Sequence, residues 1–241
     1  MSTARLSSAR RRFGAGLAAL ACTALCGCAL LPESPPERPV QEQAGPTLGA
    51  QVPSDWQDLR HRSGLVYSVP PEWAVVAEDA PGAADDSLDW GFGVLTSANA
   101  EAQRGYCSLT GTSSFRVRVG LTEPAQGDAE SITASMSRSM GDAMDTMFSE
   151  HGSEVDLGHA DKIGVSGTLA YHQTIRGTPK EPRSICTPPT IRADVIGVSI
   201  GSPESPETVA LLLMTDEDQP GVEPAEVIDQ VLGSLRFDNM V

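Results

Sequence analysis

The residues of this chain best suited to covalent chemistry are its cysteines, and Cys28 has the most distinctive surroundings. It ends the run Leu25-Cys26-Gly27-Cys28, which closes an apolar stretch over residues 13–25. A basic head, Arg10-Arg11-Arg12, precedes that stretch, and this order is typical of a secretory signal peptide. The stretch is shorter than the roughly 20 apolar residues that a membrane span needs. We therefore expect residues 1–27 to be a signal peptide that is removed after export, which leaves the Cys28 thiol at the start of the mature chain.

The same four residues resemble the bacterial lipoprotein signal, in which Leu, a tolerant position, a small residue and an obligatory Cys follow one another. The resemblance implies that the Cys28 thiol carries a diacylglyceryl group and that its amino group is open to acylation. Each buried methylene contributes about 0.8 kcal/mol, so two acyl chains anchor stably where one does not. We expect a lipid-anchored protein at the extracytoplasmic face of the cell membrane. A plain cleaved signal is the alternative, and the arginines also resemble a twin-arginine signal, so the export route stays open.

The expected mature chain is strongly acidic. Removal of residues 1–27 takes four arginines and no acidic residue from the 17 basic and 32 acidic residues, which leaves a net charge of −19. Nucleic acids and anionic headgroups attract positive surfaces, so both are excluded as expected partners. Lys162 and Lys180 are the only lysines, and this bias, together with the lipoprotein signal, suggests an actinobacterial source.

Two cysteines, Cys107 and Cys186, remain in the folded part of the expected mature chain. An even pair outside the cytoplasm indicates a disulfide. A catalytic or metal-binding cysteine would need a nearby histidine or a Cys-x-x-Cys spacing, and neither is present in the sequence. We therefore predict a Cys107–Cys186 bond.

The mature chain divides into a tether and one domain. Residues 28–54 are rich in proline and poor in residues that could build a core, which predicts a lipidated Cys followed by an extended, disordered segment. Residues 55–241 have the length of one ordinary domain.

Alternating patterns predict strands, and a period near 3.6 predicts helices. Residues 65–69 and 73–76 should form a hairpin with Pro70-Pro71-Glu72 at its corner. Further strands are expected at 90–95, 105–109, 115–119, 168–176, 190–200 and 208–215. Asp128 is placed to cap a helix that ends near Gly152, and a last helix should begin at Pro224. This order favours an α+β fold in which two helices pack on an antiparallel sheet.

Two motifs carry a resemblance to the PsbP-like fold, including the actinobacterial LpqN-type lipoproteins. They are Tyr67-x-Val69-Pro70-x-x-Trp73 and the closing Ile228-x-x-Val231-Leu232-x-Ser234-Leu235-Arg236. The resemblance implies an α/β/α sandwich that acts as a binding or assembly module, with no catalytic residues to carry over.

The histidines offer a weak case for a metal. His159 could join carboxylates to bind a divalent cation, because imidazole and carboxylate suit such ions. The other candidates are His151, Glu150, Glu154, Asp156 and Asp161. Acidic residues are dense throughout the chain, so a solvated acidic turn is the favoured interpretation. His61 lies between Arg60 and Arg62, which would repel a cation. We expect no metal.

Catalytic signatures are missing from the sequence. Gly164-Val165-Ser166-Gly167 lacks the spacing of a nucleophile elbow, and the glycines make no phosphate-binding loop. We expect neither an enzyme nor a cofactor. The expected function is a non-catalytic interaction module of the cell envelope with a protein partner.

The alternative is a carrier or sensor of a small apolar ligand in a pocket beneath the Met-rich helix, since methionine side chains adapt to varied ligands. Core packing is the favoured interpretation of that methionine stripe. The basic, proline-stiffened loop over residues 177–189 could face a partner, although a loop held by the disulfide is the simpler interpretation.

Overall fold

The computed structural model describes residues 47–48, 52–76, 88–90, 92–107, 115–148, 152–181 and 187–238. Its main feature is a ten-stranded sheet in the order β1-β9-β10-β11-β12-β7-β6-β4, with β5 paired to β6 and β8 paired to β12. The strands are β1 (Thr47–Leu48), β4 (Ala74–Val76), β5 (Leu88–Asp89), β6 (Leu95–Ala102), β7 (Val117–Thr122), β8 (Ala125–Gln126), β9 (Ser153–Val165), β10 (Thr168–Pro179), β11 (Thr190–Ser199) and β12 (Glu207–Glu217). The β1–β9 pair is parallel, and the other strand pairs of the described residues are antiparallel.

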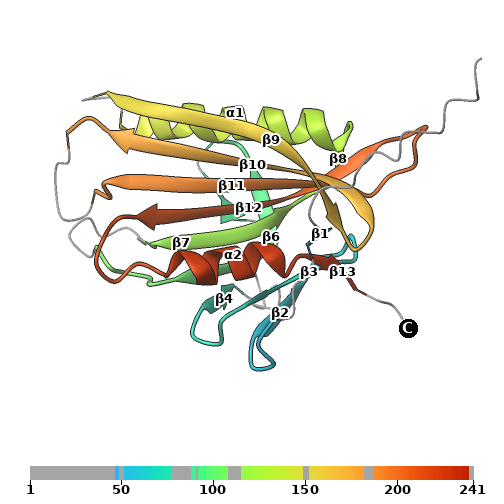
Figure 1. Ribbon diagram of the computed structural model, residues 1–241, viewed down its shortest axis with the longest axis horizontal. Coiled ribbons are helices and arrows are strands. Elements are labelled where there is room, and N and C mark those ends of the chain that lie inside the picture. The colour runs from blue at the N-terminus through green and yellow to red at the C-terminus, as the bar shows by residue number, and fades with distance from the viewer. Residues whose placement is uncertain are drawn as a thin grey trace, which may run out of the picture. The chain divides into compact units, whose positions relative to one another are not determined.

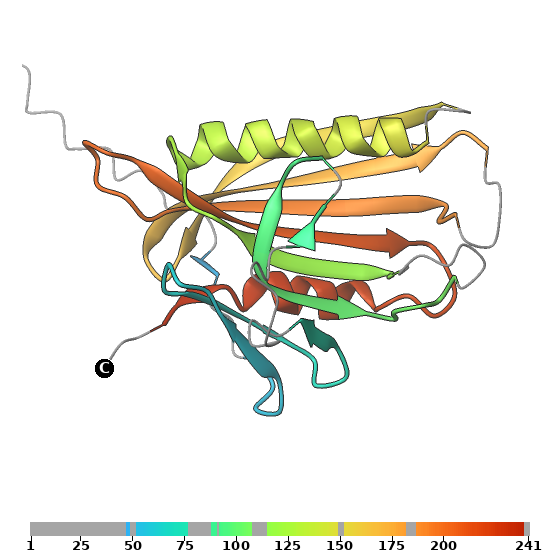
Figure 2. The same cartoon turned by 180° about the vertical axis from the view of Figure 1, so that it is seen from behind.

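Two helices cover opposite faces of this sheet (Figures 1 and 2), α1 (Ala129–Met147) and α2 (Ala225–Gly233). The side chains of α1 share a core with alternate residues of β10, β11 and β12, such as Ile175 and Leu212. Those of α2 share a second core with the intervening residues, such as Leu211 and Leu213. Because a strand presents successive side chains to opposite faces, β12 contributes to both cores. The predicted α+β class and α/β/α sandwich are confirmed.

Helix α1 begins where the sequence predicts. The Asp128 side chain accepts a hydrogen bond from the Ser131 backbone N–H at 2.8 Å, which is the usual N-cap contact. Met140 and Met144 are each only 1% exposed, so the inner methionine face of the helix is core. The helix ends at Met147, earlier than the expected end near Gly152.

A small second sheet is the first departure from the prediction. It has the order β13-β3-β2, with β2 at Gln57–Arg60, β3 at Leu65–Val69 and β13 at Arg236–Phe237. The predicted hairpin of residues 65–69 and 73–76 is therefore wrong, because β3 pairs with β2 and β13 whereas β4 pairs with β6. The turn at Pro70, which accepts from the Trp73 N–H at 3.1 Å, carries the chain from one sheet to the other.

Strand β9 is the second departure. The sequence favoured a solvated acidic turn here, but Ser153–Val165 pair with β10 along their length. Two smaller corrections follow. Residues 105–107 form a turn and the irregular segment that follows it, where a strand was expected. The predicted tether contains β1, which pairs with Gly164 and Val165.

Candidate functional site

An open groove of about 500 Å³ lies between α1 and the segment that carries Trp90 and Phe92. We call it the aromatic groove. Met147 at the end of α1 is 59% exposed and forms part of its wall. The complete lining is Trp90, Phe92, Ser139, Asp142, Ala143, Thr146 and Met147.

A polar network holds the aromatic wall in place. The Trp90 indole N–H donates to Thr96 Oγ1 at 2.7 Å, and the Thr96 hydroxyl donates to Asn99 Oδ1 at 2.6 Å. Phe92 meets Trp90 edge to face, with ring centroids 6.3 Å apart and an interplanar angle of 71°. Edge-to-face packing is a favoured aromatic geometry, so the two rings support each other.

Backbone irregularity in β6 makes this network possible. The register between β6 and β7 shifts between Ser97 and Ala100, and Ala98 has a φ of 49°. Asn99 then lies directly over Gly120 of β7, where a Cβ atom would be 2.1 Å from Asn99 Oδ1. Glycine at 120 is therefore required for the approach of the asparagine.

The groove combines an apolar wall with a few polar groups. Phe92 and Met147 supply aromatic and thioether surface, Trp90 behind them is only 8% exposed, and Asp142 and Thr146 are exposed on α1. Aromatic residues and methionine are enriched in protein interfaces, and binding pockets place a few polar groups within an apolar lining. The groove could receive an apolar side chain of a partner or a small apolar molecule.

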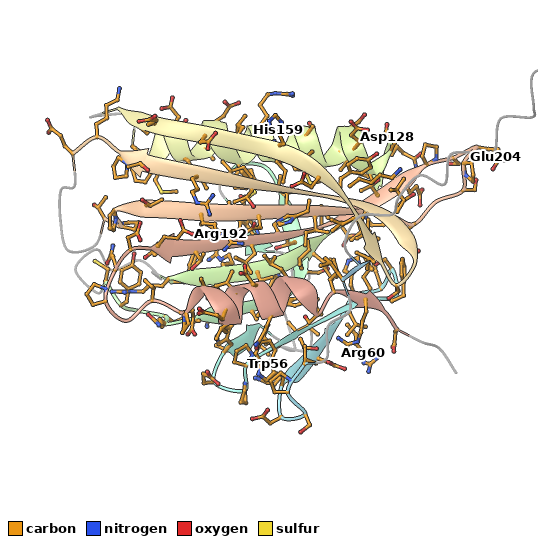
Figure 3. The ribbon with its side chains drawn as sticks, viewed as in Figure 1. Trp56, Arg60, Asp128, His159, Arg192 and Glu204 are labelled. Atoms are coloured by element: carbon orange, nitrogen blue, oxygen red, sulfur yellow. The ribbon has the colours of Figure 1, made fainter. Side chains whose placement is uncertain are left out.

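A second groove, of about 300 Å³, lies beside the N-terminal end of α2. Arg192 lines it, but its guanidinium already binds Asp194 at 2.7 Å and Asp229 of α2 at 3.0 Å. Asp194 is fully buried and also accepts from His172 Nε2 at 2.9 Å. Burial would raise the pKa of Asp194, but the His172 hydrogen bond and the Arg192 charge outweigh it, and the pKa is lowered. This buried network ties β10, β11 and α2 together (Figure 3 labels Arg192).

The histidine and carboxylates weighed for a metal are spread along β9. Glu154, Asp156, His159 and Asp161 are all exposed there, with His159 labelled in Figure 3. In the described part of the chain, no three His, Cys, Asp or Glu side chains are grouped to hold a metal ion. His151 and Glu150 lie outside the described residues.

Of the cysteines named in the sequence predictions, only Cys107 lies within the described residues. Cys107 is buried and disulfide-bonded. Cys186, its expected partner, lies outside the described residues, as do Cys28, the leader over residues 1–27 and most of the tether. No helix among the described residues is both long enough and apolar enough to cross a membrane.

Comparison with known proteins gives the family. A family model described as a domain of unknown function (DUF8017) matches residues 49–239. The chain belongs to this family. No curated protein matches it. The DUF8017 match spans both sheets and both helices, and it begins just after β1.

One solved structure that is similar to this chain is the solution structure of cyanobacterial PsbP (CyanoP) from Synechocystis sp. PCC 6803. The similarity has a TM-score of 0.43 and 14% sequence identity, and it covers 80% of this chain and 98% of that chain. PsbP is also the group that the sequence motifs resemble. A likeness at this TM-score carries neither a site residue nor an activity to this DUF8017 domain.

Sequence reasoning missed the aromatic groove. Trp90 and Phe92 were assigned to a regular strand over residues 90–95, whereas β6 begins at Leu95. The sequence did contain one signal for an aromatic cluster, because Trp90 and Phe92 lie two positions apart in a chain with only 5% aromatic residues. The wall also depends on the contact between this segment and α1, which is distant in sequence.

Proposed function

We propose that this protein is a lipid-anchored, extracytoplasmic and non-catalytic binding module of the cell envelope. The observation that carries the proposal is the aromatic groove, with an exposed methionine beside a rigidly held tryptophan. The signal peptide and the lipoprotein motif ending at Cys28 support the anchor. The acidic composition supports a protein partner over nucleic acid.

Two of the buried carboxylates among the described residues are engaged in ion pairs that serve the fold. Asp194 is bonded to Arg192 and His172, and Glu101 is bonded to Arg118 at 2.8 Å. Side chains bonded in this way fix neighbouring strands in place.

The groove is tested by crosslinking in cells. A photoreactive phenylalanine analogue replaces Met147 in the tagged full chain, and the same analogue replaces Val75 in the control. Val75 is 40% exposed on β4 and does not line the groove. We expect one stoichiometric partner crosslinked from position 147 and not from position 75. The same pattern from both positions, or none from 147, contradicts the proposal.

The anchor is tested by metabolic labelling with an alkyne fatty acid. Wild type should incorporate the label, Cys28→Ser should lose it, and Cys26→Ser should keep it. A chain that stays unlabelled, or that fractionates inside the cell with its leader intact, contradicts the anchor.

Binding of a small apolar molecule is the second candidate. The groove volume of about 500 Å³ falls within the usual range for ligand pockets. The space beneath α1 is filled by Met140 and Met144, so a ligand would lie beside the helix. Native mass spectrometry of protein purified from its own host should then show a co-purifying ligand, which Met147→Glu loses.

A further inference from the structure

The outer edge of β9 is largely unpaired. Along one side β9 pairs with β10 from Ser153 to Val165. On its other side, Gly164 and Val165 pair with β1, and residues 153–163 have no strand partner within the described chain (Figure 1). An unpaired edge presents backbone N–H and C=O groups that can pair with an added strand.

The first half of this edge has two chemically different faces. Val155 and Leu157 face α1, where a Cβ atom at Gly141 would lie 3.3 Å from Val155 Cγ1 and 3.0 Å from Leu157 Cδ2. Glu154 and Asp156 are exposed on the opposite face, as the alternation of a strand requires.

Between α1 and the edge lies a groove of about 230 Å³, which we call the edge groove. Leu157 within it is 43% exposed. The lining consists of Arg138, Gly141, Asp142, Asp145, Val155 and Leu157. An added strand would place alternate side chains in this groove, because strand side chains stand perpendicular to the sheet.

The charges on the other face indicate what could pair there. The Glu154 and Asp156 side chains make no hydrogen bond or ion pair with any described residue. Asp156 is opposite Arg176 of β10, whose guanidinium binds Glu217 at 3.2 Å. A second copy of this edge would bring acidic residues opposite acidic residues, whereas basic residues opposite them would be attracted.

We propose that Ser153–Leu157 and the edge groove bind an extended segment of a partner protein in which basic and apolar residues alternate. The segment adds a strand to β9. Its basic side chains lie opposite Glu154 and Asp156, and its apolar side chains enter the edge groove against Val155 and Leu157. This inference rests on the proposed binding function and specifies the chemistry of the partner.

The test uses the full chain and a blocked peptide of alternating lysine and valine. Fluorescence polarisation should show saturable binding, and hydrogen exchange should slow over residues 153–157. A peptide with glutamate for lysine should not bind. A peptide N-methylated at the alternate residues whose N–H groups face β9 should bind at least tenfold more weakly, because it cannot complete the backbone ladder.

Charge reversal gives matched variants. Glu154→Lys with Asp156→Lys should weaken binding of the lysine peptide at least tenfold and allow the glutamate peptide to bind. The control is the double variant Asp55→Lys with Glu204→Lys, which changes the net charge by the same amount at two other exposed sites. Figure 3 labels Glu204, and it labels Trp56, the residue that follows Asp55. It should leave the affinity within twofold.

Several results would overturn the inference. They are no binding of the lysine peptide at millimolar concentration, equal binding of the N-methylated peptide, equal loss in the control, or protection away from β9. If any of these results is found while position 147 still crosslinks a partner, the strand-binding surface on β9 is wrong and the proposed binding module is retained. If crosslinking from position 147 also fails, both proposals are wrong.

Discussion

His61 is a buried histidine whose environment disfavours its charged form. Its side chain is 4% exposed, and Nδ1 lies 2.7 Å from Ser63 Oγ. Its Nε2 has no hydrogen-bond partner among the described residues. Burial, with a contribution from the Arg62 charge, lowers the pKa of His61 to about 4. From the sequence, the flanking Arg60 and Arg62 indicated only that His61 would not bind a cation.

We predict that His61 weakens the fold in mild acid. Between pH 6.5 and 4 the imidazole of His61 binds a proton in the unfolded chain but not in the folded chain, so the contribution of this residue to the free energy of unfolding should fall by about 3 kcal/mol. His61→Phe cannot bind this proton, and its stability should lack that fall. Urea unfolding at pH 7, 5.5 and 4.5 measures the difference. Parallel pH profiles for the two proteins would contradict the prediction.

Asp216 has the opposite pH dependence. Its side chain is 8% exposed and Oδ2 has no hydrogen-bond partner among the described residues. Burial raises the pKa of Asp216 to about 6, against the lowering effects of the Arg116 charge and a hydrogen bond with Tyr106. The folded chain therefore holds a proton that the unfolded chain releases.

For Asp216→Asn we predict greater stability at neutral pH. Above pH 6 the folded wild type must hold a buried carboxylate, which costs up to about 3 kcal/mol relative to the unfolded chain. The amide removes this cost, so the variant should exceed wild type at pH 7.5, and the difference should vanish near pH 4. A lower stability of the variant at pH 7.5, or a gain that persists at pH 4, would count against this assignment. Because His61 and Asp216 act in one pH range with opposite signs, wild type should vary little there.

At the scale of elements, the close packing of α1 on β11 depends on Gly197. A Cβ atom at Gly197 would lie 2.2 Å from Thr133 Oγ1 and 3.0 Å from the Ala129 carbonyl oxygen. Backbone at that distance cannot move aside without shifting the helix.

Gly197→Ala should therefore destabilise the protein by about 1–3 kcal/mol, the usual range for overpacking a core. Adding Thr133→Ala removes the closer clash and should recover part of the loss. Chemical unfolding of the single and double variants measures both effects. An unchanged stability in Gly197→Ala would show that the helix can shift at no cost.

Elements with a clear periodic pattern were predictable from sequence. The alternation of β10, the apolar runs of β11 and β12, and the Asp128 cap all agree with the structure. These features are local, so a sequence window contains the information.

Strand β9 was missed because of its place at an edge. Its outward residues are acidic and few of its side chains are fully buried, so its composition matched a solvated turn. The Val155, Leu157 and Ile163 positions carried a weak alternation that a bulge interrupts. The aromatic groove was missed for another reason, since it forms only where α1 meets a segment about 50 residues away.

At the scale of the whole domain, two cores share one sheet. Leu211 and Leu213 face α2 while Ala210 and Leu212 face α1, and all four are fully buried. Loss of order in β12 would open both cores, which predicts a cooperative unfolding transition of the folded domain.

The disulfide of Cys107 should add to the stability of this domain. Cys107 follows the turn after β6, and Cys186, its predicted partner, falls between β10 and β11. A bond between them would close a loop of about 80 residues, which restricts the unfolded chain and stabilises the fold by about 4 kcal/mol. Cys107→Ser and Cys186→Ser should therefore lower the free energy of unfolding by similar amounts, and the double variant should lose no more than either single variant. A reductant should bring wild type to the same level and leave the double variant unchanged. Additive losses, or a wild type insensitive to reductant, would contradict a stabilising bond between Cys107 and Cys186.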